Sequence, residues 1–512
     1  MSEAYLKSIS PTYSKYFSQQ ESFERKLAKY DLSSGEITGS NSMGAPYSGG
    51  VPLSFNKKKN SVFVDDTDSH SLIIGATGSK KSRLIALPLV KLLGAAGESM
   101  IISDPKAEVF ERTAKKLEQL GYDIKTINLR DPKSGNAWNP LSVPYEHYSK
   151  KNYDRAFEFA NDIAVNLAGI HDSKKDPFWD QSASTFFFGL IMLLFKFCRD
   201  CKLDSGYVSI ENLLRLRTFI CADESGEITL ANKLKKFAKG DPFIYSLLIG
   251  TVDTYSSTKA GILSVFDQKM RTFTIQPSLR SMLAGDTQLL DKIQQKPTAI
   301  FLILPDEKTS YHNLVSLFIK QSYEKLIFNA QEMRSRSDAS LLRVNYILDE
   351  FSSLPTIHDF PAMITAARSR NIRFNLFVQS KHQLDLRYGE ESYTIRANCN
   401  NWIFLVSREI SLLQEVSELC GKRHKEGNTV PILSVTDLQR LDKELGEVLI
   451  LSGRGKPYVA QLPDINMYDN DVFEIMEHET RLSNSQKYDI TKKMTEYFKI
   501  EKQIHDVLNF DF

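Results

Sequence analysis

The segment Ser71-Leu-Ile-Ile-Gly-Ala-Thr-Gly-Ser-Lys-Lys-Ser82 joins a short apolar run to a glycine-rich turn, and residues 83–93 continue with helical spacing. A buried strand that passes through such a turn into a helix is typical of a phosphate-binding loop, in which backbone N–H groups and the helix N-terminus face an anion. In the template G-x-x-x-x-G-K-[ST], Gly75 is the first glycine, Lys81 reaches the β- and γ-phosphates and Ser82 meets Mg²⁺. The segment therefore predicts a nucleotide site in an α/β domain.

The loop departs from the template at one position, where Lys80 stands in place of the second glycine. Glycine lets the backbone approach the phosphates closely there, so a side chain threatens the fit. The added positive charge either offsets that steric cost or itself occupies the phosphate position. From this segment alone, a glycine-rich turn before an ordinary helix is the alternative. The candidate nucleotide-binding residues of the loop are Gly75, Ala76, Thr77, Gly78, Ser79, Lys80, Lys81 and Ser82.

Two adjacent carboxylates end another apolar run, Tyr346-Ile-Leu-Asp349-Glu350. In a nucleotide hydrolase the first carboxylate, Asp349, holds Mg²⁺ together with Ser82, and the second, Glu350, orients or deprotonates the attacking water. A solvated acidic pair at a strand end is the alternative. A phosphate loop and an apolar strand ending in Asp-Glu in one chain favour the nucleotide site.

Gln379 ends the next expected strand, at residues 374–378. Ligands of parallel sheets sit outside the carboxyl ends of the strands, so this amide is placed to sense the γ-phosphate or to position water. An ordinary amide at a strand end is the alternative. Arg368 lies in Arg368-Ser-Arg370, which leads into the same strand. It either serves a neighbouring subunit's nucleotide or belongs to a solvated basic turn, and the residues alone favour the turn.

Short apolar runs alternate with helical patterns over much of the chain. The expected strands lie at residues 71–74, 100–102, 124–128, 299–304, 344–348, 374–378, 402–406 and 448–451. This rhythm predicts an α/β fold with a mostly parallel sheet covered by helices on both faces. Between residues 145 and 290 only helical periodicity appears, which predicts an inserted all-α domain.

These patterns divide the chain into four parts. The nucleotide-binding domain is expected at 61–144 and 291–465, around the all-α insertion at 145–290. An N-terminal arm at 1–60 is expected to be partly flexible because of its Gly/Ser-rich stretch at 33–50. Residues 331–340 form a polar linker. A helical tail at 466–512 carries Ile490, Met494, Phe498 and Ile504 near one face.

The composition is that of an ordinary globular protein, with 512 residues of which 42% are hydrophobic and 25% charged. A net charge of +2 provides no global basic field for a nucleic acid, so any contact with DNA depends on local lysine and arginine placement. Five sparse cysteines indicate a reducing compartment, and Cys198 and Cys201 read as neighbours one helical turn apart rather than as a zinc site. The apolar run at 186–195 is too short to cross a bilayer and predicts a buried helix, so we expect a soluble protein.

Eight sequence blocks follow one another in a fixed order. They are Gly75–Ser82, Asp104-Pro-Lys-Ala-Glu108, Trp138-Asn-Pro-Leu141, Asp176-Pro-Phe-Trp179, Leu348-Asp-Glu-Phe351, Gln379-Ser380, Asn398-Cys-Asn400 and Gly453-Arg-Gly-Lys-Pro457. As a series over residues 60–465 they resemble the TraG-like coupling proteins of conjugation and type IV secretion, within the FtsK–HerA group of hexameric DNA motors. Single blocks such as Asp-Pro-Lys mean little, whereas the ordered series is specific.

The resemblance implies a RecA-like P-loop NTPase with an all-α insertion. It implies ATP and Mg²⁺ at Lys81, Ser82 and Asp349, with Glu350 as catalytic carboxylate and Gln379 as sensor. It also implies that Arg368 is an arginine finger acting across the subunit interface of a homo-hexamer. The implied partners are single-stranded DNA bound to a relaxase, the relaxase itself and type IV secretion channel proteins.

Three departures from the family pattern shape the expectations. The sequence shows no counterpart of the family's N-terminal membrane anchor, so we expect a soluble, cytoplasmic variant that a membrane partner recruits to the inner face of the cell membrane. Ala107 replaces a glycine in Asp-Pro-Lys-Gly-Glu, and Lys80 replaces one in the phosphate loop. The expected function is a coupling ATPase that drives relaxase-bound DNA into the channel. The alternatives are a non-hydrolysing coupling adaptor with a degenerate loop, and a genome-processing or defence translocase of the same superfamily.

Overall fold

The computed structural model describes residues 23–38, 49–168, 177–221, 241–285, 288–305, 307, 311–336, 341–425, 427–453, 455–468, 476 and 488–497. The chain forms two compact units. The sheet unit comprises Met1–Thr126, Leu290–His312 and Leu326–Glu477. The helical unit comprises Ile127–Leu289, Asn313–Lys325 and His478–Phe512.

A nine-stranded sheet has the strand order β15-β14-β11-β5-β10-β9-β6-β8-β7. Its strands are β5 (His70–Ile74), β6 (Ser99–Asp104), β7 (Asp123–Asn128), β8 (Thr298–Ile303), β9 (Val344–Leu348), β10 (Ile372–Val378), β11 (Cys399–Phe404), β14 (Glu447–Ser452) and β15 (Tyr458–Gln461). The pairs from β11 through β5, β10, β9 and β6 to β8 are parallel, and β14 pairs antiparallel with both β11 and β15. Every residue of β5, β6, β8, β9 and β10 is buried, which explains why their sequences are mostly apolar and do not alternate with polar residues. The predicted α/β class with a mostly parallel sheet is confirmed.

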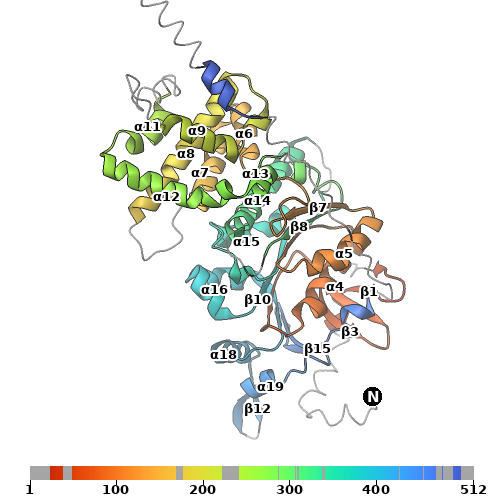
Figure 1. The fold of residues 1–512 in the computed structure, drawn as a ribbon. Helices are drawn as coiled ribbons and strands as arrows, with labels where there is room; N and C mark the ends of the chain where they lie inside the picture. The colour runs from red at the N-terminus through yellow and green to blue at the C-terminus, as the bar shows by residue number, and fades with distance from the viewer. Residues whose placement is uncertain are drawn as a thin grey trace, which may run out of the picture. The chain divides into compact units, whose positions relative to one another are not determined.

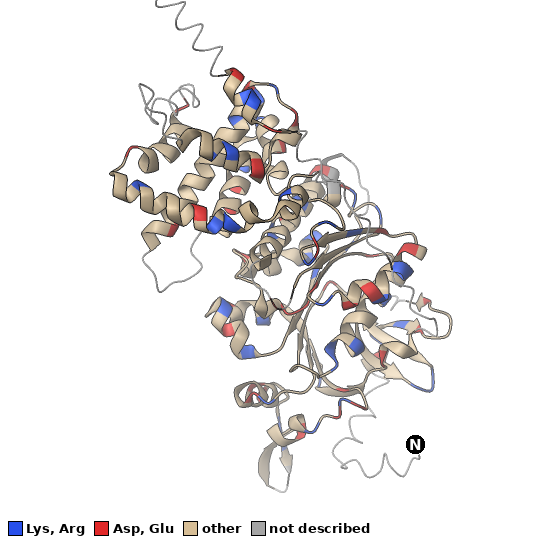
Figure 2. Cartoon of the chain, in the orientation of Figure 1, with Lys and Arg blue, Asp and Glu red and all other residues tan. Residues whose placement is uncertain are grey.

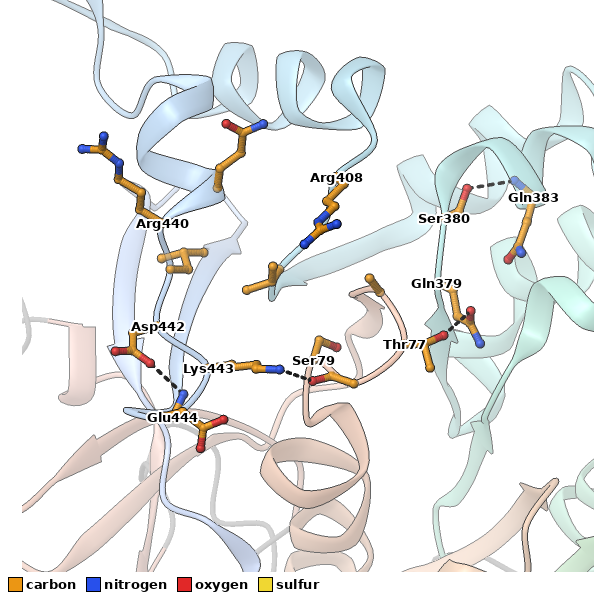
Figure 3. Close-up of a pocket in the computed structure, with 15 residues that line it drawn as sticks. Thr77, Ser79, Gln379, Ser380, Gln383, Arg408, Arg440, Asp442, Lys443 and Glu444 are labelled. Atoms are coloured by element: carbon orange, nitrogen blue, oxygen red, sulfur yellow. Dashed lines mark hydrogen bonds between the residues drawn. The ribbon is translucent and has the colours of Figure 1, made fainter.

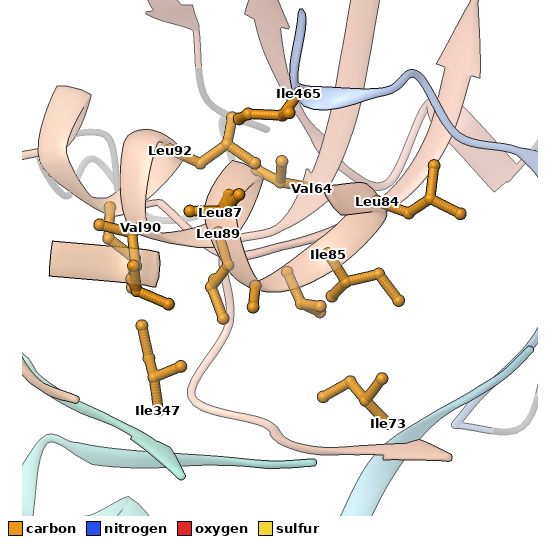
Figure 4. Packing of buried hydrophobic residues seen from close by; sticks show 14 of the residues in the cluster. Val64, Ile73, Leu84, Ile85, Leu87, Leu89, Val90, Leu92, Ile347 and Ile465 are labelled. Carbon is orange, nitrogen blue, oxygen red and sulfur yellow. The ribbon is translucent and has the colours of Figure 1, made fainter. Parts of the chain in front are cut away.

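Helices cover the sheet on both faces (Figure 1), with α4 and α5 on one and α15 and α16 on the other. The helices of this unit are α4 (Leu87–Ala95), α5 (Glu108–Gln119), α15 (Phe360–Ala367), α16 (Lys381–Tyr388), α17 (Glu391–Asn398), α18 (Ile410–Leu419) and α19 (Val435–Gln439). A single π-helical turn, Ser82–Ala86, precedes α4. Figure 4 shows side chains of this turn and of α4, such as Ile85 and Leu89, gathered with Ile73 and Ile347 of the sheet. Each such buried side chain contributes about 1.5–3 kcal/mol, so the start of α4 is firmly anchored.

The described residues before β5 form a small antiparallel sheet within the segment predicted as a partly flexible arm at 1–60. Its strands are β1 (Ala28–Asp31), β2 (Ile37–Thr38), β3 (Val51–Asn56) and β4 (Ser61–Asp65), in the order β2-β1-β4-β3. Leu53, Val62 and Val64 are buried completely in the core of the unit. The sequence did not indicate these strands, because short apolar strands beside a Gly/Ser-rich stretch carry little pattern of their own. Residues 1–22 and 39–48 lie outside the described part.

The helical unit agrees with the predicted insertion in class but not in boundaries. Its helices are α6 (Ser142–Ser149), α7 (Tyr153–Ala168), α8 (Pro177–Asp200), α9 (Ile210–Cys221), α11 (Pro242–Val252), α12 (Ser256–Ile275) and α13 (Pro277–Met282). The unit begins at Ile127 rather than at 145, because the stretch before α6 packs within it. There the Trp138 ring lies edge-on to Phe318 at 5.2 Å, and Gln321 donates to the Pro140 carbonyl at 3.0 Å.

Among the described residues one helix, α8, is long and apolar enough to cross a membrane. Within the unit, 78% of its most apolar window is buried, which is typical of a core helix. Basic and acidic residues are interspersed along the coloured ribbon of both units (Figure 2), in line with the net charge of +2.

The predicted linker at 331–340 and the predicted helical tail at 466–512 are each described in part. α14 (His312–Arg336) continues into the predicted linker at 331–340, of which residues 337–340 lie outside the described part. In the tail, residues 491–497 are helical, and Ile490 and Met494 are buried. Asn212 accepts from the Ile490 N–H at 3.2 Å and donates to the Tyr488 carbonyl at 2.7 Å, so this part of the tail packs on the helical unit. Phe498 and Ile504 lie outside the described residues.

Candidate phosphate-binding site

The glycine-rich loop leaves β5 between its two neighbouring strands. The Gly75 N–H donates to the Val378 carbonyl at 3.2 Å, and the Ala76 N–H donates to the Val406 carbonyl at 2.9 Å. A Cβ atom on Gly75 would lie 2.6 Å from Ser79 Oγ, so the loop packs against itself where the template requires glycine. The loop is thereby fixed at the carboxyl ends of three adjacent strands, where parallel sheets bind ligands.

Lys80 keeps the backbone conformation of the glycine that it replaces. Its φ is 65°, in the left-handed region that side chains disfavour. Its ammonium group contacts Glu444 Oε2 at 2.5 Å. Ala107 behaves in the same way, with a φ of 60° at the start of α5. Both departures from family glycines therefore leave the glycine-like path of the chain intact.

Lys81 and Asp349 lie together in the buried part of the site. The Lys81 ammonium donates to the Gly75 carbonyl, and its burial lowers the pKa although Asp349 and Glu350 act to raise it. Burial, helped by the negative charge of Glu350, raises the pKa of Asp349 to about 6. Ser103 Oγ donates to the Asp349 carbonyl at 2.9 Å and so ties β6 to the end of β9.

Gln379 connects the phosphate loop to the second carboxylate. Its Oε1 accepts from the Thr77 hydroxyl at 2.9 Å, and its Nε2 donates to Glu350 Oε1 at 2.8 Å. Glu350 has a φ of 52°, a strained conformation of the kind found at functional sites. A conformational change at either end of this bridge would reach the other end through one side chain.

A cavity of about 280 Å³ joins these groups in one place. Its lining residues are Ala76, Thr77, Gly78, Ser79, Lys80, Lys81, Ser82, Arg83, Asp104, Pro105, Lys106, Glu108, Val109, Asp349, Glu350 and Gln379. The structure thus brings together the loop, both carboxylates and the glutamine that the sequence analysis selected. A larger, open cavity of about 830 Å³ adjoins the other side of the loop and is lined by Arg408, Arg440 and Lys443 among others (Figure 3).

Asp104 is a site residue that the sequence analysis quoted only as part of a motif. It ends β6, and its side chain accepts from the Phe110 N–H at 2.8 Å at the start of α5. Burial raises its pKa to about 7, although the backbone N–H groups of Phe110 and Val109 act to lower it. Asp104 lies beside Asp349 because β6 and β9 are parallel neighbours in register. Its position just after the predicted strand at 100–102 is the sequence signal that could have found it.

Arg368 is not brought to the phosphate loop of its own chain. It precedes β10, whereas Gln379 follows it, and the seven residues of this strand span roughly 23 Å. Its guanidinium pairs with Asp68 at 2.9 Å, and both side chains are about half exposed.

The donor set of the cavity fits a nucleotide phosphate with Mg²⁺. Ser79 Oγ is buried without a partner among the described residues, and Gly78, with a φ of 75°, has open space at its Cβ position. No cluster of three metal-binding side chains occurs in the described part of the chain. Mg²⁺ needs none, because it binds through one or two protein groups and keeps water and phosphate oxygens as its other ligands. Ser82 and Asp349 both line the cavity and supply such groups.

The parallel sheet, the loop after β5 and the acidic end of β9 define the RecA-like P-loop NTPase fold, with an all-α insertion. The family model for conjugative DNA transfer by the type IV secretory system matches residues 18–439. The chain belongs to this family.

Solved structures support the same fold. Bacterial conjugative coupling protein TrwBdeltaN70, in a trigonal form in complex with sulphate, is 16% identical with a TM-score of 0.57, and the match covers 84% of this chain and 91% of that chain. Plasmid coupling protein TrwB is similar both in complex with the ATP analogue ADPNP and in complex with ADP and Mg²⁺. Each of these is 16% identical with a TM-score of 0.54, covering 81% of this chain and 87% of that chain. No curated protein matches the sequence.

Proposed function

We propose that this chain is the coupling ATPase of a conjugative system, which drives relaxase-bound single-stranded DNA into a type IV secretion channel. The bridge from Thr77 through Gln379 to Glu350 is the observation that carries the proposal. It links the phosphate loop to a carboxylate that would face the attacking water, and a hydrolase requires a residue that positions this water.

Each residue of the site has a role in this proposal. Bound ATP and Mg²⁺ would supply the reacting phosphoryl group and the neutralisation of its charge. The backbone of the loop and Lys81 would hold the phosphates, and Ser82 and Asp349 would hold the metal ion. Glu350 would take the proton of the attacking water, and Gln379 would position that water or sense the γ-phosphate.

Arg368 is proposed to act at the nucleotide site of a neighbouring subunit rather than at that of its own chain. It lies at the amino end of β10, so a catalytic role requires that it serve a neighbouring subunit in a homo-hexamer. An arginine supplied in trans stabilises the charge of the transition state. Contact with the DNA backbone should be largely independent of sequence and weakened by salt.

The remaining partners follow from the family. We propose a relaxase, the channel proteins and a membrane-docking protein as partners, with the chain in the cytoplasm at the inner face of the membrane. The name of the matching family supports the DNA-transfer part of this assignment.

A non-hydrolysing adaptor is the second candidate, and Lys80 favours it. A side chain in the left-handed region puts strain in the loop where phosphates bind. The test compares wild type, Lys80→Gly and Lys81→Ala in ATP hydrolysis stimulated by single-stranded DNA. Turnover by wild type well above Lys81→Ala supports the coupling ATPase. Wild type equal to Lys81→Ala, with activity gained in Lys80→Gly, supports the adaptor.

A further inference from the structure

Two consecutive side chains from a distant segment contact the phosphate loop. Lys443 donates to the Gly78 carbonyl at 3.2 Å, and Glu444 pairs with the Lys80 ammonium at 2.5 Å. We call Lys443 and Glu444 the loop clamp. Figure 3 shows Lys443 extended from its segment towards the loop. The clamp therefore contacts both residues of the loop that have left-handed backbone conformations, Gly78 and Lys80.

The segment that carries the clamp is held in shape by its own hydrogen bonds. Asp442 Oδ1 accepts from the Glu444 N–H at 2.8 Å and from the Leu445 N–H at 3.3 Å. Glu447, at the start of β14, donates its N–H to the Asp442 carbonyl at 2.9 Å and accepts from the Asp442 N–H at 3.0 Å. The backbone position of Glu444 is thus set by β14 and not by the loop, and its carboxylate reaches Lys80 from that position.

A second contact supports the same region from the end of the sheet unit. Arg83 follows the loop and forms a bidentate ion pair with Asp464. Its Nε donates to Oδ2 at 2.8 Å and its Nη2 donates to Oδ1 at 2.6 Å. Paired contacts of this geometry are the strongest class of side-chain ion pair. The loop and the turn after it are therefore both fixed from the segments that flank β14 and β15.

We infer that Glu444 is a positioning residue, which holds Lys80 in the glycine-like conformation and draws its ammonium away from the phosphate cavity. A lysine without this partner would lose the interaction that offsets its strained φ. The loop would then relax, and the backbone N–H groups would no longer converge on the phosphates. This inference rests on the proposed nucleotide-binding function, and it names the residue that makes Lys80 compatible with that function.

The first measurement is the affinity for ADPNP with Mg²⁺, determined by calorimetry. Glu444→Gln removes the charge and keeps the size of the side chain. We expect its affinity to fall by about two- to fivefold, the range for one exposed ion pair. Glu418→Gln, which removes an exposed carboxylate from α18 in the same unit, is the matched control and should leave affinity unchanged.

A double-mutant cycle separates positioning from general damage. In the Lys80→Gly background the strain and the ion pair are both absent, so adding Glu444→Gln should not reduce affinity further. Hydrogen exchange of the nucleotide-free protein gives an independent measure. There Glu444→Gln should raise the exchange rate of residues 75–82 by about two- to fivefold, and again only when Lys80 is present.

The outcomes distinguish this inference from the proposed function. The role of Glu444 would be overturned if Glu444→Gln changed neither affinity nor exchange, or if it lowered affinity equally with Lys80 present and in the Lys80→Gly background. Binding of ADPNP by wild type would still support the proposed function in that case. Absence of ADPNP binding in wild type and in Lys80→Gly would overturn the function. In that case the exchange measurement still decides whether the clamp orders the loop.

Discussion

Replacing Asp104 by asparagine should stabilise the nucleotide-free protein at alkaline pH and have little effect at acid pH. Burial raises the pKa of this carboxyl from 3.8 to about 7, so the folded chain holds its proton more tightly than the unfolded chain does. Stability is then lost as the pH rises from 3.8 through 7. The interval of about three pH units corresponds to about 4 kcal/mol of unfolding free energy above pH 7.

Asparagine avoids the buried charge and keeps a side-chain oxygen that can accept hydrogen bonds from the N–H groups now bonded to Asp104. A neutral acceptor bonds these groups more weakly than a carboxylate, which costs about 1 kcal/mol or more. We therefore expect a net gain of about 2–4 kcal/mol at pH 8.5. At pH 5.5 the folded aspartic acid is neutral but the unfolded one is already ionised, so about 2 kcal/mol of this loss is present. After the cost of the weaker acceptor, the difference between the two proteins should be about 1 kcal/mol.

Thermal unfolding at the two pH values measures this difference. With roughly 2 °C per kcal/mol for a unit of this size, Asp104→Asn should raise the Tm by about 4–8 °C at pH 8.5 and by no more than about 2 °C at pH 5.5. Glu418→Gln serves as the control, with the same small effect at both pH values. An equal shift at both values, or a lower Tm at pH 8.5, would refute the argument from burial.

Gln379→Ala should lower the kcat of ATP hydrolysis by about 100-fold with little change in ADPNP affinity, because it removes a link made for catalysis; a parallel loss of affinity would show that the bridge only holds the loop. Arg368→Ala should abolish hydrolysis and leave nucleotide affinity nearly intact, and Asp68→Ala should leave hydrolysis unchanged. Loss of affinity in Arg368→Ala would reject the role in trans. Burial lowers the pKa of His70 from 6.5 to about 4, so its contribution to stability is complete above pH 6.5 and is lost as the pH falls toward 4. Measured as the difference between wild type and His70→Gln, which cancels the opposing titrations of Asp104 and Asp349, about 2 kcal/mol should be lost by pH 5. A flat difference would contradict the burial of neutral His70.

The central strands could be predicted because they are buried on both faces. Residues 344–348 were expected as a strand and are β9, and the other predicted strands differ from the observed ones by a few residues at their ends. The strands β3 and β4 were missed, since Pro52 and Ser54 break the apolar run of β3 and the apolar run of β4 is only three residues long between Ser61 and Asp65. A run of two or three apolar residues beside polar ones does not distinguish a strand from a loop.

The site was predictable as a set of motifs but not as a set of contacts. Motif spacing selected the loop, Asp349, Glu350 and Gln379, and the parallel topology brings them to one edge of the sheet. The pairing of Lys80 with Glu444 joins residues 364 positions apart, which local sequence patterns do not encode. The left-handed backbone of Lys80 could not be predicted either, because lysine rarely adopts this conformation, whereas a glycine at the same position would have indicated it.

The N-terminal sheet has a practical consequence for shortened versions of the protein. β4 pairs with β1 along one edge and with β3 along the other. A chain trimmed to begin at residue 60, just before β4, would leave β4 with two open edges and the surrounding core uncovered. Open strand edges form hydrogen bonds with the strands of other molecules, so the trimmed protein should aggregate even though every residue of the phosphate site is present.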